Sequence, residues 1–234
     1  MNTGKYKDAT VVLAHAAWAD ASSWNKIIPQ LQRIGLQVMS AQLPLTSLLD
    51  DVAALQQALA RARGPVVLAA HSYGGAVITA AAVGKSQVKA LVYIAAMAPD
   101  EGELVGQLLQ RAEEHPKAPQ LAPDENGLIW MSAEGFANAV APESSPEELA
   151  LMTATQKPIN VKCLGEAMSR PAWREKPSWY LLAEKDRMIA PATQRFMAER
   201  MQAHIDSRDV DHTPLASAPE SVARIIVTAV DGSI

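Results

Sequence analysis

Residues 65–78 read Pro65-Val66-Val67-Leu68-Ala69-Ala70-His71-Ser72-Tyr73-Gly74-Gly75-Ala76-Val77-Ile78. The segment opens with a continuous apolar run, which is typical of a β-strand buried on both faces. Small residues then flank a serine, so the chain can turn sharply from the strand into a helix. This pattern indicates a nucleophile elbow, a turn that presents a serine hydroxyl near the free N–H groups of a helix start. The alternative is an ordinary tight strand-to-helix turn.

The motif departs at one position from its usual form, G-x-S-x-G. Ala70 stands where the first glycine is expected. Because alanine is the next smallest residue, we interpret Ala70 as a tolerated variant.

Apolar strands and helices alternate on either side of this segment, which is the signature of a parallel sheet with helices on both faces. The sequence therefore predicts an α/β fold. The expected strands are residues 9–14, 36–41, 65–70, 88–95, 178–183 and 204–210. The expected helices are residues 24–34, 49–62, 74–83, 191–201 and 219–230.

The stretch from residue 99 to residue 176 breaks this alternation with recurring prolines and a higher charge. A structureless loop of this length is improbable inside a domain, so we predict an inserted helical cap with short helices at 104–114, 133–139 and 146–155. Residues 1–98 and 177–234 would then form the core of a single domain. An apolar substrate pocket is expected from Trp18, Trp130, Met131, Phe136 and Met152. Ordinary packing between cap and core is the alternative for each cap residue.

The composition is that of a globular protein, with 234 residues of which 49% are hydrophobic and 20% charged. A net charge of −4 offers no basic patch for nucleic acid or an anionic membrane. The N-terminal residues lack the apolar region of a signal peptide, and no apolar stretch approaches the roughly 18 residues of a membrane span. The single cysteine, Cys163, is expected to be a buried or incidental thiol. These features predict a soluble cytoplasmic protein without nucleic-acid or membrane partners.

A nucleophilic serine needs a base within hydrogen-bond reach and a third group that orients the base. Ser72, Asp186 and His212 each follow a predicted strand, at the sheet edge where functional loops gather. Their order along the chain, serine then acid then histidine, is that of α/β-hydrolases. Asp211 is less suited as the acid, because adjacent side chains rarely meet in the required geometry. His15 is expected to order the loop after the first strand rather than to act as the base.

Acyl transfer also needs preorganised N–H donors for the oxygen that becomes negatively charged. One donor is expected from the backbone of Tyr73, directly after the serine, and the other from the loop that follows the first strand.

On these residues the chain resembles the α/β-hydrolase superfamily, and within it the small esterases related to plant methylesterases and hydroxynitrile lyases. The matching motifs are His15-Ala16-Ala17-Trp18, Ala70-His71-Ser72-Tyr73-Gly74-Gly75, Glu184-Lys185-Asp186-Arg187 and Asp211-His212. The resemblance implies that Ser72 is the nucleophile, His212 the general base and Asp186 the residue that holds the imidazole. It also implies that the N–H of Ala17 is the second oxyanion donor. Ala16 replaces the glycine that commonly follows the histidine in this family.

The expected function is a carboxylesterase that cleaves small-molecule esters through an acyl-enzyme on Ser72. One alternative is a hydroxynitrile lyase or another enzyme that cleaves carbon–carbon bonds, although Ala16 and Thr213 replace the threonine and lysine of that lyase. A non-catalytic ligand receptor on the same fold is another. No cofactor or metal is expected, because nucleotide-binding motifs and metal-ligand spacings are missing from the sequence. The expected assembly is a monomer or a homodimer.

Overall fold

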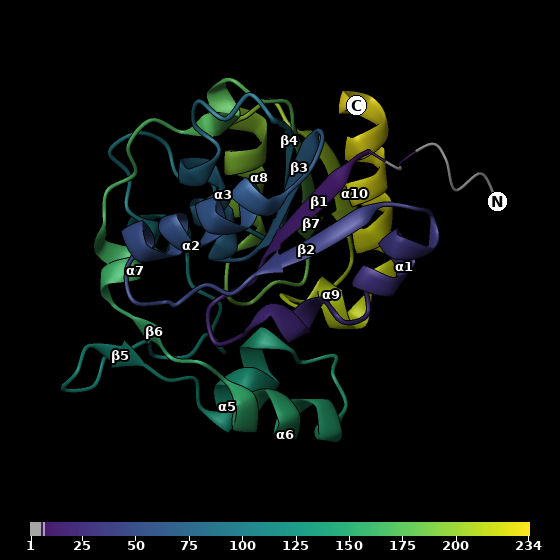
Figure 1. Ribbon diagram of the computed structural model, residues 1–234. Helices are drawn as coiled ribbons and strands as arrows, with labels where there is room; N and C mark the ends of the chain where they lie inside the picture. Colours follow the sequence, from purple (N-terminus) through teal and green to yellow (C-terminus); the bar gives the residue numbers. More distant parts are fainter. Residues whose placement is uncertain (1–5, 7) are drawn as a thin grey trace.

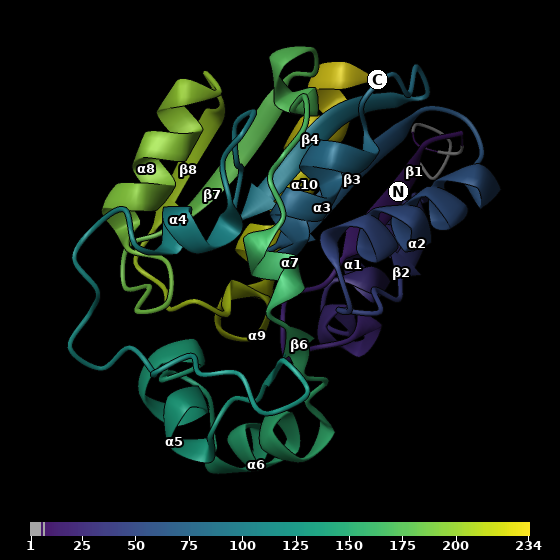
Figure 2. The same ribbon diagram turned by 90° about the vertical axis from the view of Figure 1, so that its left-hand side faces the viewer.

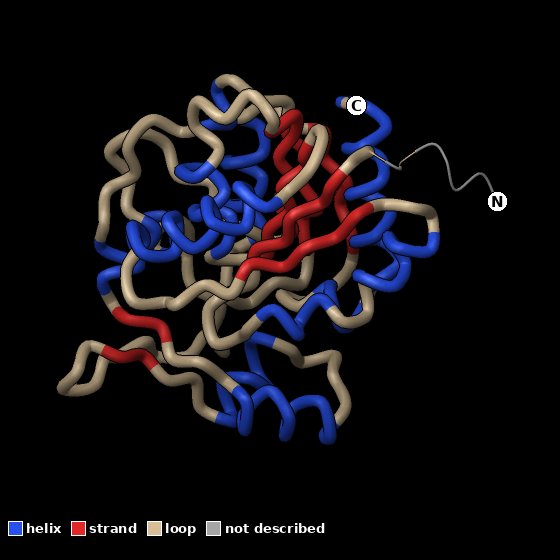
Figure 3. Tube along the Cα trace, in the orientation of Figure 1, coloured by secondary structure: helices blue, strands red, loops and turns tan. Residues whose placement is uncertain are grey.

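A parallel β-sheet forms the centre of the protein, as the computed structural model in Figure 1 shows. The structure describes Tyr6 and residues 8–234. In this part of the chain six strands lie in the order β2-β1-β3-β4-β7-β8, and each neighbouring pair is parallel. They are β1 (Thr10–Ala14), β2 (Gln37–Ala41), β3 (Val66–His71), β4 (Val88–Ile94), β7 (Ser178–Ala183) and β8 (His204–Arg208). The predicted α/β architecture is confirmed (Figure 3).

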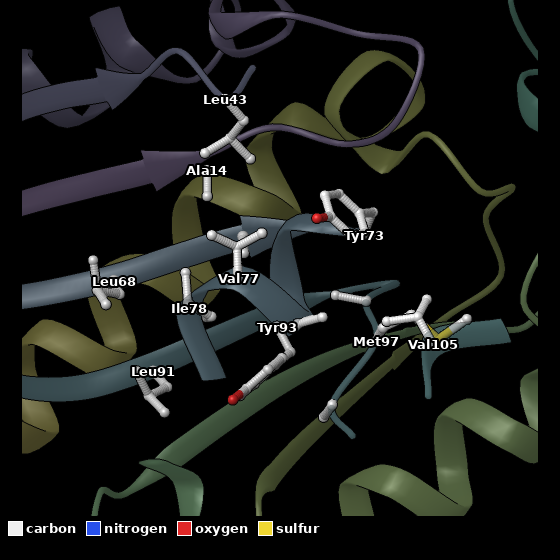
Figure 4. Close-up of a cluster of buried hydrophobic side chains, with 14 of the residues drawn as sticks. Ala14, Leu43, Leu68, Tyr73, Val77, Ile78, Leu91, Tyr93, Met97 and Val105 are labelled. Atoms are coloured by element: carbon white, nitrogen blue, oxygen red, sulfur yellow. The ribbon is translucent and has the colours of Figure 1, made fainter. Parts of the chain in front are cut away.

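Helices cover both faces of this sheet (Figure 1). One face carries α2 (Leu48–Arg61), α3 (Gly74–Ala81) and α8 (Pro191–Arg200), and the other carries α1 (Ile28–Arg33) and α10 (Pro219–Ser233). Successive side chains of a strand point to opposite faces, so a strand covered on both sides needs apolar residues throughout. In β1, Val12 packs in the core under α2 and α3, and Val11 packs in the core under α1 and α10. Figure 4 shows part of the first core, with residues of α3 against those of β3 and β4.

Prolines lie in the first turns of three helices that cover the sheet or its loops. The single helix predicted at residues 24–34 consists instead of a 3-10 turn, η1 (Ala21–Trp24), and α1. Pro29 lies in the first turn of α1, where a residue without an N–H is tolerated. Near the C-terminus, α9 (Pro214–Ser217) and α10 each begin with proline.

The inserted segment divides into a lobe and two flanks. The lobe lies beyond the carboxyl ends of the strands (Figures 1 and 2). It contains β5 (Leu128–Ile129), α5 (Ala133–Gly135), the π-helix η2 (Phe136–Val140), α6 (Pro146–Thr155) and β6 (Ile159–Asn160). The flanks contain α4 (Val105–Leu109), α7 (Lys162–Gly165) and η3 (Ala172–Arg174), and their side chains join the core of α2 and α3. Apolar residues from both ends of the predicted 99–176 cap join the core of α2 and α3, and so do Ile129, Phe136 and Ile159 of the lobe.

Within the insertion, α6 begins and ends where the sequence predicted a helix. Ser145 caps it, with Oγ accepting a hydrogen bond from the N–H of Glu148 at 3.2 Å. The helix predicted at 104–114 ends at Leu109. The antiparallel pair β5–β6 was not predicted, since strands of two residues carry no readable periodicity.

Candidate active site

The turn between β3 and α3 has the geometry of a nucleophile elbow. Ser72 has a φ of +51°, a left-handed conformation that is costly for any residue other than glycine. A Cβ on Gly74 would lie 2.6 Å from the carbonyl oxygen of His15, and one on Gly75 would lie 2.3 Å from that of Met97. These close backbone approaches explain why two glycines follow the serine. Ala70 lies fully buried within β3, so the first motif position accommodates a methyl group.

Ser72, His212 and Asp186 come together in one chain of hydrogen bonds. Nε2 of His212 lies 2.9 Å from Oγ of Ser72, and Nδ1 lies 2.7 Å from Oδ2 of Asp186. All three residues are buried. Since a carboxylate only accepts, Nδ1 carries the proton in this arrangement and leaves Nε2 free to accept the serine proton. The residues reach this geometry from three loops, which follow β3, β7 and β8.

Asp186 is held by three further hydrogen bonds. Its Oδ1 accepts from the N–H groups of Met188 and Ile189, at 2.7 and 2.9 Å. Its Oδ2 accepts from Nε2 of Gln194 at 2.7 Å. Gln194 lies on α8 with no exposed surface, and its Oε1 accepts from the N–H of Ala183 at 3.1 Å. The sequence analysis did not identify Gln194. The feature that could have indicated it is a polar residue on the helix that follows the loop of Asp186.

Asp211 has a different set of partners from Asp186. Its Oδ1 accepts from the N–H of Thr213 at 3.0 Å and from Oγ of Ser217 at 3.0 Å. Its Oδ2 accepts from the N–H of Glu143 in the inserted lobe, at 3.1 Å. Asp211 therefore shapes the loop of His212 and ties it to the lobe.

Two further histidines support the backbone around the site. Nε2 of His71 donates to the carbonyl oxygen of His212 at 2.6 Å. His15 accepts at Nε2 from the N–H of Leu43 at 2.9 Å, so its Nδ1 carries the proton and donates to the carbonyl of Ala16. Burial lowers the pKa of His15 to about 4 and that of His71 to about 3, so both rings are neutral near pH 7.

The backbone N–H groups of Ala17 and Tyr73, the two expected oxyanion donors, have no hydrogen-bond acceptor among the described residues. The loop that contains Ala17 is held at its far end by Trp18, whose Nε1 donates to the carbonyl of Ile129 in β5 at 2.9 Å. Trp18 itself has a φ of +56°. An unpartnered N–H at a tightly held turn is available to a ligand oxygen.

A cavity of about 250 Å³ lies between the loop after β1, the inserted lobe and the loop of His212. Of the five residues expected at a substrate pocket, Trp18, Phe136 and Met152 line this cavity, together with His212 and Thr213. The other two predicted pocket residues, Trp130 and Met131, lie elsewhere, beside a separate cavity between α5 and residues 116–120.

Local packing explains why Trp130 and Met131 lie away from the cavity beside His212. The sulfur of Met131 packs toward Gly135 of α5, and its backbone binds the side chain of Gln156. Trp130 is 54% exposed. Apolar character marked both residues as candidates, but it does not reveal on which side of a lobe a side chain lies.

A sequence profile of the alpha/beta hydrolase family matches residues 11–225. The chain belongs to this family. Among solved structures, a polyneuridine aldehyde esterase resembles the hydrolase with a TM-score of 0.84 and 19% identity, over 96% of this chain and 100% of that one. A pyrethroid hydrolase from Sphingobium faniae has a TM-score of 0.81 and 22% identity, over 95% and 97% of the two chains.

Two further relatives cover nearly the whole hydrolase. A methylesterase from Arabidopsis has a TM-score of 0.79 and 19% identity, over 96% of this chain and 99% of that one. The alpha/beta hydrolase nvfD of Aspergillus novofumigatus is 26% identical over 230 residues, which cover 91% of this chain and 90% of the relative. These similarities extend the α/β-hydrolase fold over both the core and the inserted segment.

Among the helices of the described part of the hydrolase, none has the length and apolar character needed to cross a membrane. The described residues also contain no group of three or more His, Cys, Asp or Glu side chains arranged to hold a metal ion.

Proposed function

We propose that the hydrolase is a carboxylesterase in which Ser72 is the nucleophile, His212 the general base and Asp186 the orienting acid. The observation that carries this proposal is the unbroken chain of hydrogen bonds from Ser72 through His212 to Asp186. Relatives of the same fold that are named as esterases support it further.

In the proposed reaction, Nε2 of His212 takes the proton of Ser72 as Oγ attacks the ester carbonyl. The N–H groups of Ala17 and Tyr73 then stabilise the negatively charged oxygen of the tetrahedral intermediate. When the intermediate collapses, His212 returns the proton to the leaving alcohol and the acyl group stays on Ser72. A water molecule, deprotonated by His212, releases the acid and restores the serine.

The cavity beside His212 favours esters of small, largely apolar compounds. Its volume of about 250 Å³ lies below the range of roughly 300 to 1,000 Å³ that is usual for drug-sized ligands. Phe136, Val140 and Met152 give its lobe side an apolar lining.

The lining argues against hydroxynitrile lyase chemistry, which requires a cation near the departing cyanide. Thr213 occupies the position after His212 and lines the cavity. Lys26 also lines the cavity, but its Nζ donates to Glu148 at 2.9 Å and to the carbonyl of Ala216 at 3.2 Å.

We further propose that the esterase acts in the cytoplasm on a small-molecule ester, without a nucleic-acid or membrane partner. Its cysteine, Cys163, is buried and unpaired, which suits a reducing compartment. Fractionation of the source cells would test this location, and light scattering would distinguish the expected monomer from the expected homodimer.

The deciding experiment is a panel of p-nitrophenyl esters of increasing acyl length, assayed with the wild-type protein and with Ser72→Ala. We expect turnover of the short esters by the wild type only, and labelling by a fluorophosphonate probe only when Ser72 is present. Ser23→Ala is the matched control, because Ser23 lines the same cavity but binds only the carbonyl of Asp20 through its hydroxyl. Retained turnover in a folded Ser72→Ala protein would exclude this mechanism. Labelling of the wild type without repeated turnover would instead support a receptor.

A further inference from the structure

A fully buried carboxylate lies close to the elbow, outside the chain of Ser72, His212 and Asp186. Asp51 of α2 has no exposed surface. Its Oδ2 accepts from the hydroxyl of Tyr73 at 2.6 Å, and its Oδ1 accepts from the N–H of Leu45 at 2.7 Å. The thiol of Cys163 also approaches Oδ2, at 3.7 Å. Burial raises the pKa of Asp51, as expected for a carboxylate removed from water.

The capping of α2 does not account for this buried acid. Ser47 is the N-cap residue of α2, and its Oγ accepts from the N–H of Asp50 at 3.0 Å. Asp51 lies one residue further into the helix and bonds through both oxygens to groups outside it. Since a buried carboxylate is costly compared with an apolar residue, the two partners of Asp51 are the features to explain.

The two partners of Asp51 are the hydroxyl of Tyr73 and the N–H of Leu45. Through the segment Leu43–Leu45 they connect the two expected oxyanion donors. The N–H of Leu43 donates to Nε2 of His15, which begins the loop that contains Ala17. The N–H of Leu45 donates to Asp51, which in turn accepts from the side chain of Tyr73. Leu45 has a φ of +60°, a conformation that a leucine adopts only when its surroundings hold it there.

The inserted segment binds the opposite side of Leu43–Leu45. Nζ of Lys157 donates to the carbonyl oxygen of Leu43 at 2.6 Å, and the N–H of Asn160 donates to that of Leu45 at 2.9 Å. The segment is therefore fixed both by the oxyanion loops and by the base of the lobe.

We propose that Asp51 is a positioning residue that sets the N–H of Tyr73 relative to the N–H of Ala17 through Leu43–Leu45. This inference rests on the proposed function, in which both groups stabilise the oxyanion. Asp51 touches no reacting atom. It acts through Tyr73 and Leu45, and a displacement of about 1 Å at a catalytic group is enough to cost about 10²-fold in rate.

The test compares four variants of the full chain with the wild type. Asp51→Ala removes both acceptors, whereas Asp51→Asn retains an oxygen for Leu45 and offers an N–H to the oxygen of Tyr73. Tyr73→Phe removes only the phenolic hydroxyl. Tyr93→Phe is the matched control, because Tyr93 is equally buried but its hydroxyl bonds Thr79, at 2.9 Å.

Two rates are measured for each variant. Each is expressed per mole of folded protein, and near-ultraviolet circular dichroism determines the folded fraction. The first is kcat for p-nitrophenyl acetate, together with KM. The second is the rate of inactivation by a fluorophosphonate, in which Ser72 Oγ attacks phosphorus, fluoride leaves and the phosphoryl oxygen gains charge in the same site.

In Asp51→Ala and Tyr73→Phe we expect both rates to fall by about tenfold or more while KM changes by less than about twofold, because the lost interaction acts in the transition state. Asp51→Asn should recover most of the rate, and Tyr93→Phe should keep it even if its stability falls. Unchanged rates in Asp51→Ala and Tyr73→Phe would overturn the proposal. It would also fail if Asp51→Asn were as slow as Asp51→Ala while Tyr73→Phe stayed fast, because the carboxylate would then act by its charge.

Tyr73→Phe decides the question alone if Asp51→Ala does not fold. A wild type that reacts with the fluorophosphonate but hydrolyses no ester would contradict the proposed function only, since the inactivation rates still compare the variants.

Discussion

His71 and His212 are linked by a hydrogen bond of 2.6 Å from Nε2 of His71 to the carbonyl oxygen of His212. Their rings lie 5.1 Å apart between centroids and are tilted by 42°. The residue that precedes the proposed nucleophile thus holds the backbone of the proposed base, while Ser72 binds the imidazole of that base. Two contacts from adjacent residues of one turn fix His212 at both its main chain and its side chain.

Replacing His71 with leucine should lower kcat by about tenfold, because the carbonyl of His212 loses its donor and the imidazole loses part of its fixed orientation. His71→Gln retains an N–H donor and should lower kcat less. Steady-state assays of both variants on a short p-nitrophenyl ester provide the measurement. Equal rates for the leucine variant and the wild type would show that the contact between Ser72 and His212 is enough to orient the imidazole without the hydrogen bond from His71.

Replacing Gln194 with leucine should reduce both activity and stability. Asp186 and the N–H of Ala183 each lose a buried partner, at about 1 to 3 kcal/mol per unsatisfied group. We expect kcat to fall by about tenfold as the acid loses its fixed position. Thr193→Val is the control on the same helix, because Thr193 is buried and its hydroxyl has no partner in the described structure. An equal loss of kcat in both variants would refute a specific role for Gln194.

Gly75→Ala should destabilise the protein by at least about 2 kcal/mol, because its Cβ would lie 2.3 Å from the carbonyl oxygen of Met97 and that backbone would have to shift. Gly165→Ala, which meets nothing within 4 Å, should change stability by less than about 0.5 kcal/mol. Urea unfolding followed by circular dichroism measures both. Similar midpoints for the two variants would contradict the packing shown at the elbow.

Trp18→Phe should raise KM by about fivefold, since the loop after β1 loses its hydrogen bond to Ile129 of the lobe and the cavity loses part of its wall. Trp130→Phe should leave KM unchanged, because Trp130 lies outside this cavity. Initial rates over a range of ester concentrations test the pair. A higher KM in Trp130→Phe than in Trp18→Phe would move the substrate site to the other side of the lobe.

Stability should fall on acidification from about pH 6.5, the ordinary histidine value, toward pH 4. In this range the unfolded chain protonates His15 and His71, whereas the folded protein does not, because burial lowers their pKa to about 4 and about 3. At pH 5 each histidine would cost about 2 kcal/mol. Asp51 contributes to stability in the opposite direction. Burial raises its pKa, so the folded protein binds its proton more readily than the unfolded chain does, and acidification favours the folded state.

Urea titrations at pH 7.5 and pH 5.0 measure this change, and His71→Gln should reduce the difference between the two values. If the difference between pH 7.5 and pH 5.0 were as large in His71→Gln as in the wild type, the His71 ring would not be kept neutral in the folded state.

The parts of the fold that follow from hydrophobic periodicity could be read from the sequence. The buried strand before Ser72 is one example, and α10, which buries Val222, Ile225 and Ile226, is another. Residues 24–34 show the limit of periodicity: their apolar spacing predicts one helix, whereas the structure has η1, a turn, and then α1 with Pro29 in its first turn.

The contacts of the candidate site were predictable where a residue type and a place in the chain order suggest a role. Ser72, Asp186 and His212 meet these conditions, and the structure brings them into contact. Gln194 and Asp51 do not, since a lone polar residue on a helix acquires a partner only through packing of distant segments. The same limit applied to Trp130, because the face of the lobe that meets the cavity is set by tertiary contacts.

The hydrogen bond from the N–H of Glu143 to Asp211 has a consequence for redesigning the enzyme. Engineers who exchange the lobe for another, in order to change specificity, would also remove a donor from the carboxylate beside His212. A grafted lobe must therefore present a backbone N–H at the same point, or the loop of His212, the proposed general base, will lose part of its support.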